Sequence, residues 1–471
     1  MAVADNEKSP LIPKHLPKGN VRSSRPLCQK ITSLFSLITV EAAYFLYSTC
    51  YGLESVTLVN LWVDKECQHM YSMNICKVLD SGQYPKEQDT VQDKVSTYKS
   101  MYAQWIEYLP AVFVVLILGA WSDSRDRRLP VVLPFVGFLL KSLGILANCY
   151  WWSLPPKYLL FASVPVGLGG GIMALLLGSS AYVSAISRVE TRTIRLAIIQ
   201  LLYLAAVPFG KMIAAPVFTR YGYIGVFSLQ ALIIACTLLY ALIRLEKHPG
   251  VETDSSPERK VSLCHILSPH RLLESVSVAW KKREGGARMH IIGHIIIIAC
   301  LLFDVGTANF VFLYTRKKFA WDYYTFTTWS VLSTPVSGIG NAFVLPLLSY
   351  RYKVEDSIFG FMGSSSYMFT NIIQSTAPVG WVMYIAIGTS VFSGMTFAAS
   401  RGALSKLVPK EELGAIFSVV ALGETIMPLI SGPVFTAVYN MTLEIYPGTV
   451  FAFAAVIFAF TSWLYAYVYP L

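Results

Sequence analysis

Charged side chains interrupt several long apolar stretches of this 471-residue chain. Glu424 and Asp304 lie near the middle of two of these stretches. Glu54 and Arg401 lie nearer the ends of two others. An ionisable group near the centre of a bilayer costs at least about 2.5 kcal/mol on insertion scales, so it usually faces a cavity or a partner. We therefore predict that these four residues, together with Asn309, form a substrate-binding site inside a membrane protein.

Each of these groups has a chemistry of its own. The planar guanidinium of Arg401 matches a carboxylate or a phosphate, so Arg401 is the predicted anchor for an organic anion. Burial disfavours the charged form of a carboxyl group, so Glu424 and Asp304 are candidate carriers of a co-transported proton. The alternative is an internal ion pair of Arg401 with Glu424 or Asp304 that serves only the structure.

A second group of polar residues lies at the end of the apolar stretch 101–121 and directly after it. Gly119, Asp123, Arg127 and Arg128 place a small residue, an acid and two arginines at a predicted helix end. The arginines can pair with Asp123 and with carboxylates or helix ends of a neighbouring bundle, which would form a gate. The alternative is that the arginines only set the membrane orientation, which leaves Asp123 unexplained.

Other polar residues have simpler explanations. Lys211 lies near the end of an apolar stretch, so we expect its ammonium group to extend toward the membrane surface. Lys141 is expected to be packed or to lie near a helix end. His290 and His294 share a helix face but have no evident third ligand, so no metal site is predicted. The chain has no hydrolase motif and no phosphate-binding loop, so we predict neither an enzyme nor a cofactor beyond a co-transported proton.

Membrane-spanning helices must hold these residues in place. The chain is 54% hydrophobic and 14% charged, whereas about a quarter of the residues in a soluble domain are charged. A helical span needs roughly 20 apolar residues, and these stretches are too continuous for barrel strands, whose side chains alternate. We predict an all-α polytopic membrane protein with twelve spans, at 34–60, 101–121, 130–150, 158–180, 194–216, 223–243, 290–314, 326–349, 356–376, 380–406, 412–438 and 447–469.

The distribution of basic residues predicts the orientation of these spans. The net charge of +10 does not indicate a nucleic acid partner, because Lys and Arg gather in alternate loops. That distribution is the positive-inside pattern of membrane proteins. Both termini are therefore predicted to be cytosolic, and the lipid bilayer is a predicted partner.

The spans divide into two sets of six. We predict a cytosolic tail over 1–30, an amino-terminal six-helix half over 31–243, a cytosolic linker over 244–289 and a carboxy-terminal six-helix half over 290–471. Two such repeats commonly pack around a central cavity. The segment 63–100 is charged and lacks apolar periodicity, so it is predicted to be an exposed extracellular or lumenal loop. Cys67 and Cys76 lie in it and are the one pair that this topology allows to form a disulfide, unless both remain free thiols.

The segment Gly119–Arg128 resembles the cytosolic signature of the major facilitator superfamily. Three further segments, Thr193–Ile199, Arg401–Val408 and Glu411–Ser418, are similar to segments of the proton-coupled folate transporters, solute carrier family 46. The resemblance covers nearly the whole chain. It implies a major facilitator fold and alternating access, with a folate, cyclic dinucleotide, peptidoglycan fragment or conjugated metabolite as substrate.

The chain departs from this family at several positions. Asp126 stands where the signature has a glycine, and Ala320 stands where the family has a cysteine. Asp304 stands where the folate carrier has a histidine, and Gln200 where the family often has an acid. Glutamine cannot titrate, so the family's proton site in that span is not expected here. A membrane receptor or scaffold that binds a ligand without moving it is therefore the alternative to a secondary active transporter.

The amino-terminal tail contains a short sorting pattern. Glu7, Leu11 and Ile12 have the spacing of an acidic dileucine signal, which clathrin adaptors bind and which acts as an address and not as an anchor. The pattern predicts a lysosomal or endosomal membrane, with a clathrin adaptor as a partner. Without it, the plasma membrane is expected.

Overall fold

The computed structural model describes residues 39–124, 126–187, 189–246, 280–281, 283, 287–352, 355–409 and 412–468. The chain divides into two units, Met1–Thr39 and Val40–Leu471, and all the described helices belong to the second. The tail 1–30, with the sorting pattern of Glu7, Leu11 and Ile12, and most of the linker 244–289 lie outside the described residues.

The described part of the chain is built from helices. The first set is α2 (Val40–Met70), α3 (Met73–Lys77), η1 (Leu79–Ser81), α4 (Pro85–Val95), η2 (Ser96–Ala103), α5 (Gln104–Ser124), α6 (Leu129–Tyr150), η3 (Pro156–Tyr158), α7 (Leu159–Leu168), α8 (Gly171–Ile186) and α9 (Val189–Arg244). The second set is α12 (Ala287–Asp304), η5 (Val305–Asn309), α13 (Val311–Phe319), α14 (Tyr323–Ile339), η6 (Gly340–Val344), α15 (Leu345–Tyr352), α16 (Asp356–Thr376), α17 (Val382–Thr389), η7 (Ser390–Phe392), α18 (Met395–Leu407), α19 (Leu413–Thr442) and α20 (Thr449–Val468). No strand occurs among the described residues, which confirms the all-α prediction.

Eight helical segments of the described chain are long and apolar enough to cross a membrane. They are Pro85–Leu118, Leu129–Tyr150, Pro156–Ile186, Leu201–Arg244, Ala287–Asn309, Val382–Leu407, Val419–Thr442 and Thr449–Tyr467. The predicted spans 34–60, 326–349 and 356–376 correspond to α2, to α14 through α15, and to α16. The count of twelve spans and the cytosolic location of both termini stay predictions.

Two predicted spans are broken within their length. Gly170 and Gly171 separate α7 from α8 with φ values of 77° and 55°, a left-handed backbone that glycine adopts readily. The predicted span 290–314 corresponds to α12, η5 and the start of α13, and the helix changes to a 3-10 turn directly after Asp304. At this break Gly306 packs so closely on α19 that an added Cβ would lie 2.6 Å from the ring of Phe435.

The prediction that 63–100 is an exposed loop is also wrong. Helix α2 continues to Met70, and α4, η2 and α5 form one continuous helical segment from Pro85. Val91, Val95 and Gln92 are buried. The reason is that α4 packs on α2, so these few apolar residues face other helices.

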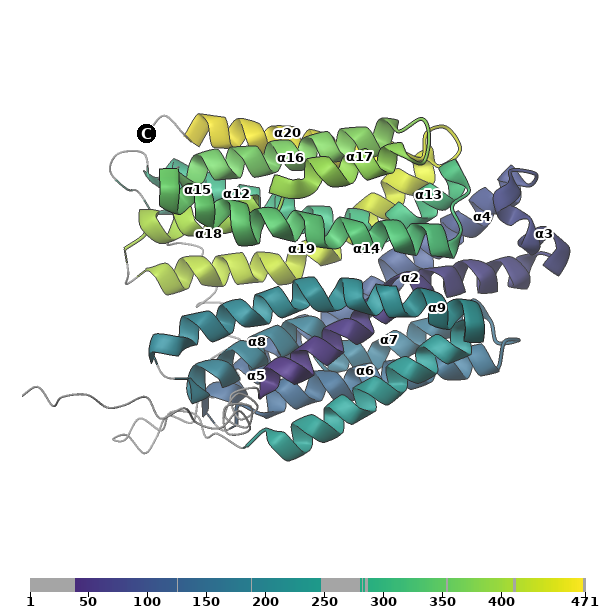
Figure 1. The fold of residues 1–471 in the computed structure, drawn as a ribbon, viewed down its shortest axis with the longest axis horizontal. Helices are drawn as coiled ribbons and strands as arrows, with labels where there is room; N and C mark the ends of the chain where they lie inside the picture. Colours follow the sequence, from purple (N-terminus) through teal and green to yellow (C-terminus); the bar gives the residue numbers. More distant parts are fainter. Residues whose placement is uncertain are drawn as a thin grey trace, which may run out of the picture. The chain divides into compact units, whose positions relative to one another are not determined.

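Two groups of helices make up the unit Val40–Leu471 (Figure 1). We call α2 to α9 the amino-terminal half and α12 to α20 the carboxy-terminal half. In Figure 1 the first half, purple to teal, lies on one side and the second, green to yellow, lies on the other. The halves meet where α9 contacts α14 and where η2 and α5 contact α19.

Helix α2 defines two ends of this unit. Its 31 residues span about 46 Å at 1.5 Å per residue. Near its last turn Cys67 and Cys76 form a disulfide with an S–S distance of 2.01 Å, which confirms the predicted pairing. We call this region, where α3 and α4 lie in Figure 1, the disulfide end, and we call the region around the first turn of α2 the opposite end.

Candidate functional site

A cavity of about 420 Å³ lies between the two halves. From the amino-terminal half it is lined by α2, η2, α5, α6, α7, α8 and α9, and from the carboxy-terminal half by η5, α13 and α14. Five of its lining residues are charged: Glu54, Lys99, Glu107, Lys141 and Lys211. Three lysines against two glutamates give the cavity a net charge of +1 when all five are ionised.

Two of the cavity lysines bind neutral partners. Lys99 Nζ donates to Oδ1 of Asn309 at 2.8 Å, and Lys211 Nζ donates to Oγ of Ser330 at 2.7 Å. Both contacts run from the amino-terminal half to the carboxy-terminal half. Neither lysine has a carboxylate within ion-pair distance among the described residues. The two ammonium groups therefore offer positive charge to a ligand in the cavity.

The third cavity lysine belongs to a buried triad. Lys141 Nζ lies 2.7 Å from Oε1 of Glu54 and 2.5 Å from Oε1 of Glu107. Gln230 donates to Oε2 of Glu54 at 2.9 Å, and Ser163 donates to Oε1 of Glu107 at 2.8 Å. The triad joins α2, α5 and α6 through charge-assisted hydrogen bonds, which are about twice as strong as neutral ones.

The rest of the cavity wall is largely apolar and aromatic. Its aromatic residues are Tyr47, Tyr51, Trp62, Tyr108, Phe138, Tyr203, Phe312 and Phe326. Ligand cavities in proteins are typically apolar, with a few polar groups that fix the orientation of the ligand. This lining suits a small molecule with an anionic group and an apolar body.

The structure brings together only some of the predicted site residues. Glu54 and Asn309 line the cavity, whereas Arg401, Glu424 and Asp304 do not. Arg401 on α18 forms an ion pair with Glu424 on α19. Its guanidinium also lies 4.5 Å from the centre of the Phe397 ring, a cation–π contact.

Asp304 lies at the last residue of α12, where the predicted span is broken. Its Oδ1 is buried and has no hydrogen-bond partner among the described residues. The predicted role of Asp304 as a proton carrier stays a prediction.

The structure describes the surroundings of only two of the four predicted gate residues, Arg127 and Arg128. Gly119 and Asp123 lie outside the described side chains. Arg127 donates to the carbonyl of Ala181 at 3.4 Å, and Arg128 donates to the carbonyl of Leu242. Both acceptors belong to the amino-terminal half, so these contacts hold the loop to its own half. A contact with the other half stays a prediction.

Sequence reasoning missed Lys99 and Glu107 and misplaced Lys211. The expectation that Lys211 extends to the membrane surface is wrong, because its ammonium group reaches Ser330 inside the cavity. Lys99 and Glu107 stand eight residues apart near the start of a predicted span, where a charge can reach the membrane surface and does not by itself indicate a cavity. The signal that could have found the triad is the pair of opposite charges, Glu107 and Lys141, within neighbouring predicted spans, since such groups pair inside a membrane.

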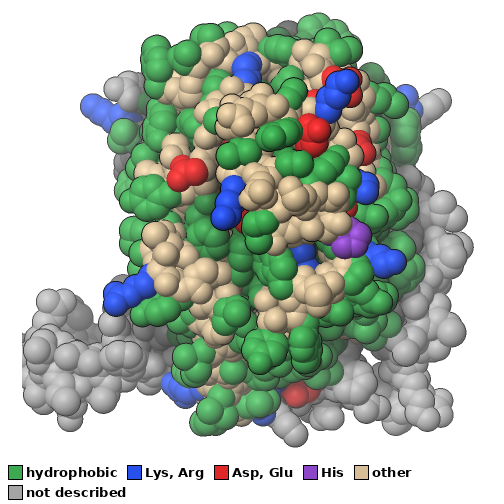
Figure 2. Space-filling model, turned by 90° about the vertical axis from the view of Figure 1, so that its right-hand side faces the viewer, with side chains coloured by type: hydrophobic (Ala, Val, Ile, Leu, Met, Phe, Trp, Pro, Cys, Tyr) green, Lys and Arg blue, Asp and Glu red, His purple; other side chains and the backbone are tan. Residues whose placement is uncertain are grey.

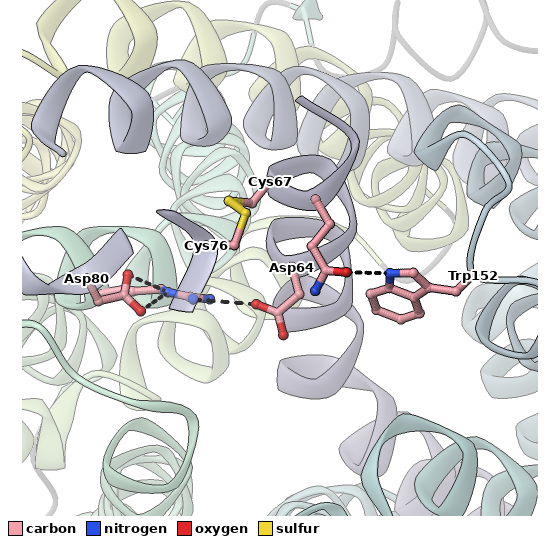
Figure 3. The surroundings of a disulfide bond; sticks show 7 residues. Asp64, Cys67, Cys76, Asp80 and Trp152 are labelled. Carbon is pink, nitrogen blue, oxygen red and sulfur yellow. Dashed lines mark hydrogen bonds and ion pairs between the residues drawn. A yellow bond between two sulfur atoms is a disulfide. The ribbon is translucent and has the colours of Figure 1, made fainter. Parts of the chain in front are cut away.

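Ion pairs between the two halves close the disulfide end. Arg316 of α13 binds Asp80 and Asn60 of the amino-terminal half, and its Nη2 lies 3.5 Å from Oδ1 of Asp64. Figure 3 shows Asp80 and Asp64 beside the Cys67–Cys76 disulfide, with these ion pairs drawn as dashed lines. Figure 2 shows acidic and basic side chains interspersed on this end of the molecule.

Further bonds reinforce this closure, and the opposite end differs. Lys317 pairs with Asp89, and Tyr439 donates to Gln92 at 2.9 Å, again between the halves. Away from the disulfide end, the ion pairs between described residues do not join the two halves. Arg195–Glu41 lies in the first half, Arg401–Glu424 and Lys406–Asp356 lie in the second, and Lys281 and Arg283 of the linker both pair with Glu412.

Comparison with known proteins places this architecture among membrane transporters. A family model described as Major Facilitator Superfamily matches residues 103–432. The "Probable peptidoglycan muropeptide transporter SLC46" of Drosophila melanogaster is 23% identical over 453 residues, which cover 93% of this chain and 85% of that protein. The human "Lysosomal proton-coupled steroid conjugate and bile acid symporter SLC46A3" is 26% identical over 376 residues, 78% of each chain. The "Proton-coupled folate transporter" of Bos taurus is 24% identical over 379 residues, also 78% of each.

Solved structures of low sequence identity share the fold. The human organic anion transporter MFSD10 (TETRAN) aligns with a TM-score of 0.60 and 14% identity, covering 94% of this chain and 100% of that chain. The nucleoside transporter NupG aligns with a TM-score of 0.62 and 12% identity, covering 93% and 99%. The family likenesses expected from the sequence are confirmed by these matches.

Proposed function

Because this chain belongs to the major facilitator superfamily, we propose that it is a secondary active transporter of a small organic anion and works by alternating access. The observation that carries the choice of an anion is the pair Lys99 and Lys211, which line the cavity with no carboxylate partner. An ammonium group binds a charged oxygen more strongly than a neutral one. An anion that enters the cavity would therefore take these lysines from Asn309 and Ser330.

This exchange links binding to the movement of the halves. Each of the two lysines connects the halves through a neutral acceptor. A bound anion would replace both of these contacts, and the aromatic wall would cover its apolar body. A ligand shifts a conformational equilibrium only by its difference in affinity for the two states. The anion would supply that difference by bridging lysines and carboxy-terminal groups in one state and not in the other.

The relatives suggest which anions to test. Their names mention muropeptides, steroid conjugates and bile acids, and folates. We extend to this chain the idea of a co-transported proton, with Glu424 and Asp304 as candidate carriers in the carboxy-terminal half. The family describes transport and not catalysis, and the proposed cycle needs neither a covalent step nor a cofactor.

Location and orientation belong to the same proposal. The chain is a multi-pass membrane protein, and we propose that both termini are cytosolic and that the disulfide end faces the lumen or the cell exterior. A disulfide persists only in an oxidising compartment, which supports this orientation. A clathrin adaptor that binds the tail would direct the protein to lysosomes or endosomes; otherwise it would stay in the plasma membrane.

Transport in proteoliposomes tests the proposal. Purified full-length protein would be given labelled taurocholate, folate and a muropeptide, with the cation tetraethylammonium as the control solute. We expect at least one anion to accumulate above protein-free liposomes, faster with an inward proton gradient, and the cation not to accumulate. Anion binding without accumulation would indicate a receptor and overturn the proposal, and so would accumulation of the cation alone.

A further inference from the structure

The triad of Glu54, Lys141 and Glu107 has one more carboxylate than it has cations. All three side chains are largely buried, Glu54 and Lys141 each with 6% of the side chain exposed. When the three groups are ionised, the triad has a charge of −1. A buried excess charge is unfavourable unless a cation, water or a proton compensates it. Ion pairing within the triad therefore leaves one negative charge for something else to neutralise.

The two carboxylates of the triad are not equivalent. Glu54 uses both oxygens, because Oε1 contacts Lys141 and Oε2 accepts from Gln230. Glu107 accepts from Lys141 and from Ser163 through Oε1 alone. Its Oε2 has no hydrogen-bond partner among the described residues, and 23% of its side chain is exposed at the cavity wall. Glu107 is therefore the carboxylate that a proton can reach from the cavity.

The groups around Glu107 leave few other proton acceptors. Helix α2 presents Glu54, Tyr47 and Tyr51, α6 presents Lys141, α9 presents Tyr203 and Lys211, and the segment that carries Glu107 itself presents Lys99 and Tyr108. The packed helix α7 contributes the neutral Ser163. Helix α19 packs on the first residues of α5, where the carbonyl groups of Pro428 and Leu429 accept from Gln104 and Trp105. A tyrosine hydroxyl and a lysine ammonium already have their protons, so the two glutamates are the carboxylates that can accept one among these groups.

We infer that Glu107 is a proton-binding residue that couples the charge of the cavity to anion binding. A proton from the cavity water adds to Oε2, and the same proton leaves from Oε2 when the cavity opens to the other compartment. Protonation makes the triad neutral and raises the net charge of the cavity from +1 to +2. An anion then binds more tightly, and by reciprocity a bound anion favours the proton.

This inference rests on the proposed function for the role of the anion, but protonation of Glu107 can be tested without a ligand. Infrared difference spectra would be recorded on full-length protein in liposomes between about pH 8 and about pH 5. We expect a band of a protonated carboxyl group that is present in the wild type and in Glu54→Gln and is lost in Glu107→Gln. Glu54→Gln is the matched control because it changes the same triad at the fully bonded carboxylate.

Two results would overturn the inference. One is an unchanged carboxyl band in Glu107→Gln protein that elutes as the wild type does on size exclusion. The other is loss of the band in Glu54→Gln with retention in Glu107→Gln, which would assign the proton to Glu54. If Glu107→Gln does not fold, Glu107→Asp, which keeps a carboxyl group, is measured in its place. We then expect the carboxyl band to shift, and an unshifted band would count against Glu107.

A transport arm separates this inference from the proposed function. For any of the three labelled anions that the wild type accumulates, Glu107→Gln is expected to lose the acceleration by an inward proton gradient. If no anion accumulates in the wild type, the proposed function fails while the infrared result still decides the protonation of Glu107. If acceleration persists in Glu107→Gln, the coupling role is overturned whatever the spectra show.

Discussion

Arg316 of the carboxy-terminal half binds Asp80 of the amino-terminal half through both carboxylate oxygens, with Nε 2.8 Å from each. The guanidinium is mostly buried, and its Nη1 also donates to Asn60 at 2.9 Å. Arg316 therefore ties α13 to α2 and η1 at the disulfide end, across the boundary between the halves. Because the ion pairs of the described residues away from this end do not join the halves, this contact is part of what keeps the cavity closed on one side.

Replacement of Arg316 by methionine should open the disulfide end. The change leaves Asp80 and Asn60 without their partner, and both carboxylates of the network are about one third exposed, so we expect a loss of about 1–3 kcal/mol. Each 1.4 kcal/mol of stabilisation lost from the closed form increases the ratio of open to closed molecules roughly tenfold. The measurement is the labelling rate of Ala308→Cys, a cavity position, by a membrane-impermeant thiol reagent added at the disulfide side.

Lys318→Met is the matched control for this experiment. Lys318 lies two residues from Arg316, but its Nζ donates to the carbonyl of Ser375 in the same half, at 3.2 Å. Loss of this contact should leave the labelling rate at the wild-type value. Equal labelling of Ala308→Cys in the Arg316→Met and wild-type backgrounds would show that the network does not hold the cavity closed.

Loss of either free cavity lysine should weaken anion binding. Lys99→Met and Lys211→Met each remove one hydrogen bond from a charged donor, a contribution of about 1.5–3 kcal/mol. The apparent affinity should therefore fall roughly 10-fold to 150-fold. Titration of a transported anion against the purified variants measures this. Lys86→Met, at an exposed lysine of α4, should bind as the wild type does. An unchanged affinity in both cavity variants would remove the lysines from the binding site.

The disulfide should stabilise the end of the molecule on which Arg316 lies. Cys67 and Cys76 are nine residues apart, and closure of a loop of this size contributes about 2–3 kcal/mol in the chain-entropy description. We expect Cys67→Ser with Cys76→Ser to lower the thermal unfolding midpoint and to increase thiol labelling in the cavity. Reductant should lower the midpoint of the wild type and leave that of the double variant unchanged. A midpoint that responds to reductant in both proteins would point to another thiol.

Stability at the disulfide end should depend on pH through Glu66. Burial raises the pKa of Glu66 above its usual 4.5, although Lys94 at 3.7 Å and His69 oppose this. The folded protein thus holds this proton more tightly than the unfolded chain. The contribution to stability is complete below about pH 4.5 and is lost as the pH rises through the folded pKa. Between about pH 5 and pH 7.5, the unfolding midpoint of the wild type should fall further than that of Glu66→Gln; parallel curves would contradict this.

The all-α class could be predicted from sequence because bilayer-spanning helices need long apolar stretches, and these are visible in any one segment. The helical packing of 63–100 could not be predicted from the sequence. Its buried residues, such as Val91 and Val95, are too few to give a periodic pattern, and they are buried only by residues that are distant in the chain. The 3-10 turn at η5 has a similar cause, which lies outside the local sequence. Gly306 is confined by Phe435, a residue of α19.

The candidate site was predicted less well than the fold. A charge inside an apolar stretch indicates that a partner or a cavity exists, but it does not say which one. Arg401 and Glu424 satisfy each other, whereas Lys211, which was assigned to the membrane surface, faces the cavity. Whether a charged side chain pairs with another or faces the cavity depends on which helices are neighbours in space and on how far the side chain reaches. The spacing of residues along the sequence gives neither.

The ion pair of Arg401 and Glu424 provides the last prediction. If Glu424 carries a proton during transport, Glu424→Gln should remove the pH dependence of anion uptake while the amount of protein in the membrane stays the same. If the pair is only structural, the same change should lower the unfolding midpoint, because Arg401 loses its carboxylate, and leave the pH profile of uptake unchanged. Uptake measured against pH, together with thermal unfolding of Glu424→Gln and Arg401→Gln, separates the two roles. A pH profile that Glu424→Gln leaves intact would exclude Glu424 from proton coupling and would leave Asp304 as the candidate of the carboxy-terminal half.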